Sequence, residues 1–226
     1  MTIDLLITNG TIVNAGSTCQ AHLAVKDGKV AGIFSELPQG SAGRVIDAEG
    51  CFVMPGVIDT HTHIEEPFQG LTPLEDWAAG SRNAAMGGVT TALNFSIQDP
   101  GHTLMDKIHE HHERISGLSC IDFNFHGVFT DYSDHQRMRR EIAELFKFGV
   151  TSLKAFMIYC SDGLYADDWS LYNLLLEIKK YFGFLAVHAQ NMPIGENMPR
   201  QMALANRLTS PRWPLSQPAF VAPDAG

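Results

Sequence analysis

From residue 53 onward, short apolar runs typical of β-strands alternate with longer stretches that have helical patterning. Strands separated by helical connections of this length pair in parallel, through right-handed crossovers. The pattern therefore predicts an α/β fold with five βα units. The predicted strands cover 52–59, 89–95, 121–129, 150–156 and 184–187, and the predicted helices cover 73–85, 103–116, 134–148 and 167–181.

The five units predict part of a TIM-type (β/α)8 barrel. A closed barrel needs eight such units, which take about 250 residues. Only about 170 residues follow Phe52, and the proline-rich tail at 211–226 shows no sixth strand. We expect an incomplete barrel over residues 54–226. The first helix is expected to take Thr72 as its N-cap and Pro73 as its first residue.

Residues 1–53 have a different pattern and form a separate, all-β segment. Asn9-Gly10 and Asp27-Gly28 lie between apolar runs, and both dipeptides suit tight hairpin turns. We therefore expect a small N-terminal β domain ahead of the barrel. Its predicted strands are 4–8, 11–13, 21–25, 29–33 and 44–47.

Composition narrows the class of protein. Of the 226 residues, 45% are apolar and 18% are charged, as in ordinary globular domains. The net charge of −9 argues against nucleic acid or an anionic membrane as a partner, and no apolar run is long enough to span a bilayer. The first residues lack the features of a signal peptide. Four widely spaced cysteines predict free thiols and a cytoplasmic protein.

Two histidines follow the first strand of the barrel segment. His61 and His63 are two residues apart, so that in a strand both imidazoles point to the same face. Neutral imidazole is a good ligand for zinc and similar divalent ions. Asp59 lies on the same face and is expected to orient a ligand rather than to bind metal. The alternative, two histidines in a polar loop, is less consistent with the preceding apolar run.

Lys154 lies inside the apolar run of the fourth strand. A lysine there is costly if it stays charged and unpaired. By itself the residue favours an ammonium that reaches water or pairs with a carboxylate. The alternative is a neutral amine that takes up carbon dioxide and becomes a carbamate, whose two oxygens can bridge two metal ions.

The positions of two further residues support a role at the same site. His188 ends the fifth strand, one βα unit after Lys154, although a lone histidine on an apolar strand is more often a core residue. Tyr159 follows Lys154 by five residues, and its phenol is either a half-buried aromatic or a donor to a developing oxyanion. His126 could line the same pocket or serve packing alone. The histidine-rich stretch 107–113 is interpreted as a solvated face of an outer helix.

In these segments the chain resembles the dihydropyrimidinase and D-hydantoinase branch of the amidohydrolase superfamily. The resemblance extends from about Asp4 to about Trp213. The stretches that carry it are Leu6-Ile7-Thr8-Asn9-Gly10-Thr11-Ile12-Val13-Asn14, Pro55-Gly56-Val57-Ile58-Asp59-Thr60-His61-Thr62-His63, Gly87-Gly88-Val89-Thr90-Thr91, Thr151-Ser152-Leu153-Lys154-Ala155-Phe156-Met157 and Val187-His188-Ala189.

The resemblance implies a small β-sandwich beside a β/α barrel, and a centre with two divalent ions, zinc or alternatively manganese. His61 and His63 would hold one ion, Lys154 would be a carbamylated bridge, and His188 would bind the second ion. Tyr159 would stabilise the oxyanion. A second histidine for the second ion and a catalytic aspartate belong to later strands, which the chain does not show. We therefore expect a C-terminally truncated protein with little or no activity by itself.

The activity implied is ring opening of dihydropyrimidines or 5-substituted hydantoins, which are small cyclic ureides, and full-length relatives are expected to be tetramers. Two alternatives remain. One is an allantoinase or dihydroorotase, but dihydroorotases usually carry an arginine at the position of Glu65. There, Glu65 and Glu66 are expected to repel an anionic ring. The other is a non-catalytic scaffold protein, which the presence of all four metal-site residues argues against.

Overall fold

The computed structural model describes residues 3–67, 70–71, 73–218 and 221. The chain divides into two compact units, Met1–Val57 and Ile58–Gly226. No helix within the described ranges is long and apolar enough to cross a membrane.

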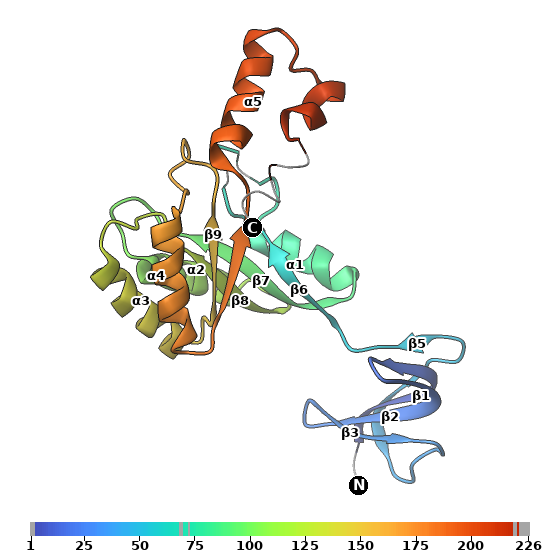
Figure 1. The fold of residues 1–226 in the computed structure, drawn as a ribbon. Helices are drawn as coiled ribbons and strands as arrows, with labels where there is room; N and C mark the ends of the chain where they lie inside the picture. The colour runs from blue at the N-terminus through green and yellow to red at the C-terminus, as the bar shows by residue number, and fades with distance from the viewer. Residues whose placement is uncertain (1–2, 68–69, 72, 219–220, 222–226) are drawn as a thin grey trace. The chain divides into compact units, whose positions relative to one another are not determined.

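The first unit is a five-stranded sheet in the order β3-β2-β1-β4, with β5 paired to β1 (Figure 1). The predicted turn at Asp27-Gly28 is confirmed, with both residues at positive φ between antiparallel β2 and β3. The turn predicted at Asn9-Gly10 is wrong, because β1 runs through it. A register shift between Ile7 and Gly10 absorbs the left-handed Asn9 as an irregularity within the strand. The strands are β1 (Ile3–Asn14), β2 (Ser17–Lys26), β3 (Lys29–Phe34), β4 (Ala42–Asp47) and β5 (Phe52–Val53).

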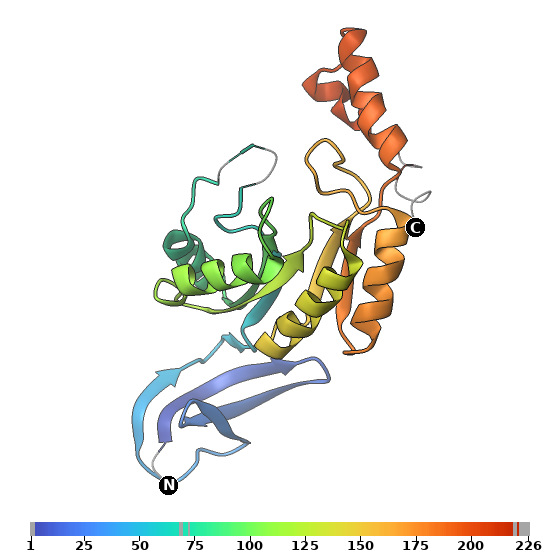
Figure 2. The ribbon, with the colours of Figure 1, turned by 90° about the vertical axis from the view of Figure 1, so that its left-hand side faces the viewer.

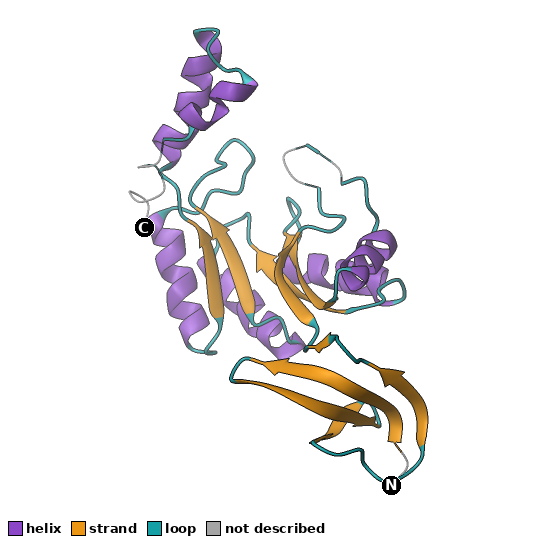
Figure 3. Cartoon of the chain, turned by 90° about the vertical axis from the view of Figure 1, so that its right-hand side faces the viewer, coloured by secondary structure: helices purple, strands orange, loops and turns teal. Residues whose placement is uncertain are grey.

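The second unit contains the predicted half-barrel, a curled sheet in the order β10-β9-β8-β7-β6. Its strands are neighbours in chain order, and β7, β8, β9 and β10 pair in parallel. Helices α1 to α4 pack on one side of the strands, so that the opposite, concave side is left for the site (Figures 2 and 3). The strands are β6 (Val57–Thr62), β7 (Val89–Ile97), β8 (Asp122–Val128), β9 (Ser152–Phe156) and β10 (Phe184–His188).

The helices agree with the predicted ones except at the two ends of the series. They are α1 (Trp77–Met86), α2 (Leu104–Ser116), α3 (His135–Phe148), α4 (Asp168–Lys179) and α5 (Met192–Leu204), followed by the 3-10 helix η1 (Ser210–Ser216). Helix α1 begins after Asp76, whose side chain accepts from the Ala79 amide, rather than at Pro73. The expected cap Thr72 lies outside the described residues. Helix α5 was not among the predicted helices, and it contains Pro193 in its first turn and Pro199 in its interior.

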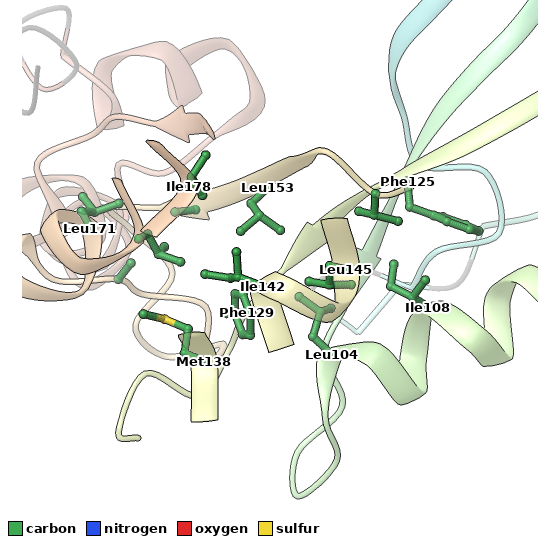
Figure 4. Close-up of a cluster of buried hydrophobic side chains, with 14 of the residues drawn as sticks. Leu104, Ile108, Phe125, Phe129, Met138, Ile142, Leu145, Leu153, Leu171 and Ile178 are labelled. Carbon is green, nitrogen blue, oxygen red and sulfur yellow. The ribbon is translucent and has the colours of Figure 1, made fainter. Parts of the chain in front are cut away.

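One hydrophobic core lies between the sheet and helices α2, α3 and α4 (Figure 4). Alternate residues of β8 and β9 enter this core, and the residues between them face the concave side. On β8, Phe125 points into the core, whereas on β9 Leu153 and Ala155 do so. Ser152 and Lys154 therefore face the concave side. The core thus fixes which side chains the strands present to the site.

Helix α3 ends at Gly149, which has φ 110° and a left-handed conformation. We expect Gly149→Ala to lower the free energy of unfolding by about 1 kcal/mol, because a Cβ disfavours this conformation. No atom lies within 4 Å of the added Cβ, so that a clash does not contribute. Gly117, the C-cap of α2, has φ −90° and equally open surroundings. Gly117→Ala is the control, and urea unfolding should show no loss for it.

Candidate functional site

The five site residues predicted from the sequence all line one cavity of about 390 Å³ in the second unit. They come from β6 and the residue after it, from β9 and β10, and from the loop that follows β9. The carboxyl ends of parallel strands lie at the same edge of a sheet, which is where such folds place their sites. The lining residues are His61, His63, Glu66, Leu71, Pro73, Lys154, Phe156, Tyr159 and His188.

The register of the strands places the lining residues in successive rows. Lys154 lies opposite Val128 on one side and Ala186 on the other. One row nearer the carboxyl end, Phe156 lies opposite His188. Residues in one row of a parallel sheet share a face. Lys154 and His188 therefore project from neighbouring rows into the same concave space.

Phe95, on β7, forms the floor beneath the histidines. The His63 ring stacks on it with centroids 4.4 Å apart, and the His61 ring meets its edge at 4.7 Å. The Nζ of Lys154 lies 5.8 Å from the Phe95 ring centroid and 5.1 Å from that of Phe156. Phe95 is 1% exposed and forms a buried apolar surface at the site.

Burial favours the neutral form of two of the imidazoles, those of His63 and His188. It lowers the pKa of His63, and the nearby His61 and Lys154 lower it further. Burial also lowers the pKa of His188, again with smaller contributions from Lys154 and His61. These mutual effects show that the four groups are close enough to interact electrostatically. Neutral imidazole is the form that binds a metal ion.

Lys154 is only 6% exposed, and burial alone lowers its pKa. It forms no salt bridge with any described carboxylate. From the sequence, Lys154 could be an ammonium that reaches water or a lysine paired with an acid. Neither interpretation agrees with these surroundings. A buried amine with a depressed pKa is the form that can react with carbon dioxide.

Tyr159 lies in the loop after β9 with φ 67°, a left-handed conformation that is unusual for a bulky residue. Its ring centroid is 5.6 Å from that of His188 and 5.7 Å from that of Phe156. Burial and the charge of Asp162 raise its pKa. The phenol therefore keeps its proton and can donate a hydrogen bond into the cavity.

The described residues fit a metal centre only if Lys154 takes part. No group of three histidine, cysteine, aspartate or glutamate side chains in the described part of the chain is arranged to hold an ion. The His61 and His63 ring centroids are 5.5 Å apart. Two imidazoles bound to one zinc ion at about 2.0 Å have centroids roughly 5 Å apart, so that this pair fits one ion. A carbamate on Lys154 would supply the missing oxygen donor.

The interpretation of the histidine-rich stretch 107–113 as a solvated face is wrong for His111. His111 is 3% exposed, and its Nε2 lies 3.2 Å from Oε2 of the equally buried Glu66. Burial raises the pKa of Glu66 to about 7 and lowers that of His111 to about 4. Between these values both groups are neutral. The helical pattern itself could have identified His111, because Ile108 and Ile115 share its face.

Glu65 and Glu66 do not act as two free negative charges, as the sequence suggested. Glu65 pairs with Arg114 at 2.5 Å and also accepts from the Trp77 backbone amide. Glu66 contacts His111 and is largely protonated below pH 7. The argument that this pair repels an anionic substrate therefore no longer holds.

The Glu66–His111 pair predicts two opposite pH dependences. Glu66 has a raised pKa, so that it destabilises the fold increasingly as pH rises from about 4.5 to about 7. His111 has a lowered pKa, so that it destabilises the fold increasingly as pH falls from 6.5 to about 4. In the intact chain the two slopes largely cancel between pH 4.5 and 6.5.

Each single variant should uncover the slope of the other residue. For Glu66→Gln, we expect the free energy of unfolding to rise by about 2–3 kcal/mol between pH 4.5 and 6.5. For His111→Phe, it should fall over the same interval. Urea unfolding at several pH values measures both, and slopes of the same sign in the two variants would contradict the assignment.

Comparisons with known proteins place this geometry among enzymes. The profile of the Amidohydrolase family matches residues 52–194. The D-hydantoinase of Geobacillus stearothermophilus is 39% identical over 82% of this chain and 39% of its own length. An allantoinase of Bacillus licheniformis is 32% identical over 97% of this chain and 49% of its own.

A solved structure shares the fold. The crystal structure of dihydropyrimidinase from Brevibacillus agri superposes with a TM-score of 0.90 and 33% identity, over 97% of this chain and 47% of that chain. This chain spans about half the length of that structure, and no more of either relative named above.

Proposed function

Because the chain belongs to the amidohydrolase family, we propose that it carries part of the active site of a metal-dependent cyclic amidohydrolase. The substrates would be dihydropyrimidines or 5-substituted hydantoins, opened to N-carbamoyl amino acids. The observation that carries the proposal is the convergence of three histidines, a buried lysine and a tyrosine on one cavity.

The proposed centre holds two divalent ions, zinc or alternatively manganese. His61 and His63 would bind one ion, Lys154 as a carbamate would bridge both, and His188 would bind the other. When bound, such ions polarise a carbonyl and lower the pKa of water. Burial supports the ligand roles of three residues, because it favours the neutral imidazoles of His63 and His188 and disfavours the Lys154 cation.

Tyr159 is proposed to act on the substrate directly. Its raised pKa keeps the phenol protonated, and its loop holds the ring beside His188. A donor placed where negative charge develops on an amide oxygen stabilises the transition state. Phe156 and Phe95 are buried, and an apolar lining of this kind would strengthen a hydrogen bond made beside it.

We still propose an uncharged ring as the substrate. The basis is now the similarity to the relatives, because the argument from charge repulsion no longer holds. The names of the most similar relatives include D-hydantoinase and dihydropyrimidinase. Allantoinases are the second candidate, because they also match nearly the whole chain. A non-catalytic scaffold is the third. We further propose a cytoplasmic protein, since all four cysteines are free thiols, and a homo-oligomer, a tetramer at full length.

Two measurements test the proposal separately. Metal analysis of the chain, purified without chelator, should find bound zinc or manganese, and near-zero metal would favour the scaffold. Hydrolysis of dihydrouracil, hydantoins, allantoin and dihydroorotate should then be compared. We expect a rate far below that of the relatives from the 226-residue chain, with hydantoins or dihydrouracil preferred. Preference for allantoin or dihydroorotate would contradict the substrate assignment.

A further inference from the structure

His126 links strands that carry the proposed metal ligands, although it does not line the cavity. Its Nε2 lies 2.8 Å from the backbone oxygen of Thr60, and its Nδ1 lies 2.7 Å from Oγ of Ser152. Thr60 belongs to β6 and Ser152 to β9, whereas His126 itself belongs to β8. The sheet order is β9-β8-β7-β6. The imidazole on β8 therefore connects β9, its direct neighbour, with β6, which lies two places away on the other side.

The two contacts define the protonation of the ring. A backbone carbonyl can only accept a hydrogen bond, so that Nε2 of His126 carries the proton and donates to Thr60. His126 is 5% exposed, and burial lowers its pKa, which favours the neutral ring. Nδ1 is then an acceptor, and the hydroxyl of Ser152 donates to it. Both ring nitrogens are thereby satisfied in one tautomer.

Each end of this bridge lies beside a proposed ligand. Thr60 directly precedes His61 on β6, and Ser152 lies two residues before Lys154, on the same face of β9. His126 is in register with Ser152. A fixed bridge in this row therefore sets the distance between the strand of the histidine pair and the strand of the lysine.

Phe95 completes the support from the strand between them. It is in register with His126, and the two ring centroids are 5.0 Å apart. Phe95 also contacts the rings of His61 and His63. The bridge and the aromatic floor thus form one buried layer beneath the proposed ligands.

We propose that His126 is a positioning residue that holds β6 and β9 at the separation required for His61, His63 and Lys154 to share metal ions. This inference rests on the proposed function, and it adds a residue that the histidine and lysine motifs do not contain. Groups that hold ligands in place commonly contribute about 10–100-fold to metal affinity.

The first test needs no metal. Nitrogen-15 spectra of the histidine rings in the metal-free chain should show His126 as the neutral tautomer with its proton on Nε2. In Ser152→Ala, the Nδ1 resonance should shift because its donor is lost. An Nδ1–H tautomer or a charged ring at neutral pH would overturn the proposal, whether or not the chain binds metal.

The second test measures Co²⁺ affinity and the ligand-field spectrum of the bound ion. His126→Phe should lower the affinity roughly tenfold and change the spectrum. His126→Gln should retain most of the affinity, because its amide offers one donor and one acceptor. Ser152→Ala loses one of the two hydrogen bonds of His126 and should lower the Co²⁺ affinity about threefold. It replaces His126→Phe in this test if that variant does not fold.

Phe125→Leu is the matched control. Phe125 is adjacent on β8 and 2% exposed, but its side chain lies in the helix-covered core. It should lose stability yet keep its Co²⁺ affinity. Equal losses of affinity in Phe125→Leu and His126→Phe, or wild-type affinity in His126→Phe, would overturn the positioning role. Absence of Co²⁺ binding by the wild-type chain would instead contradict the proposed function, and the first test would still decide the role of His126.

Discussion

Lys154→Met should lower the affinity of the chain for zinc by at least about 100-fold while leaving the metal-free fold as stable as before, or more stable. Methionine has nearly the length of lysine but no amine, so that it can form no carbamate. The site then keeps His61 and His63 but loses the oxygen donor that a complete site needs, since the described histidines and acids form no ligand set by themselves.

The expected stability of Lys154→Met follows from the surroundings of Lys154. The side chain is 6% exposed and contacts the faces of Phe95 and Phe156. A buried ammonium without a carboxylate partner is unfavourable, and a thioether in the same place is not. The prediction therefore attributes the buried lysine to chemistry at the site rather than to folding.

Two measurements check this prediction. Zinc competition with a chromophoric chelator gives the affinity, and urea unfolding in chelator gives the stability of the metal-free chain. After growth with ¹³C-bicarbonate, the wild-type chain should also show a carbamate carbon resonance that Lys154→Met lacks. Lys179→Met is the control, because Lys179 is an exposed residue of α4. Zinc binding by Lys154→Met at wild-type strength would contradict the ligand role of Lys154.

The sequence was sufficient to predict the half-barrel, because strand and helix periods differ and helices α2, α3 and α4 have clear end signals. Asp134 and Gly149, for example, cap the two ends of α3 as their residue types suggest. The turn prediction at Asn9-Gly10 was wrong because the same dipeptide suits both a hairpin turn and an irregularity inside a strand. The pairing of β1 with β2, β4 and β5 decides between them, and the partners in β4 and β5 are distant in the sequence.

The candidate site was predictable where ligands follow strands, and not where it depends on contacts across the sheet. His61, His63 and His188 could be identified from their places at strand ends. The role of His126 could not, because it depends on Thr60 and Ser152, which are 66 and 26 residues away in the chain. The state of a buried acid was equally hidden, since burial, which no local pattern shows, raises the pKa of Glu66 to about 7.

Ile142→Ala should lower the free energy of unfolding of the second unit by about 2–5 kcal/mol. Ile142 lies on α3 in the middle of the core and is fully buried, among Leu104, Leu145 and Leu153 (Figure 4). Removing its side-chain carbons loses their transfer free energy and leaves a cavity that surrounding helices cannot close, because they are fixed on the sheet.

A loss of this size is large relative to the total stability of a domain, which is about 5–15 kcal/mol. The site depends on it, because Leu153 in this core precedes Lys154 on β9 and holds that strand in register. Urea unfolding followed by tryptophan fluorescence measures the change. Met86→Ala is the control, since Met86 is an 88% exposed apolar residue at the end of a helix and should change stability little. Equal losses in the two variants would mean that the core between sheet and helices does not hold the half-barrel together.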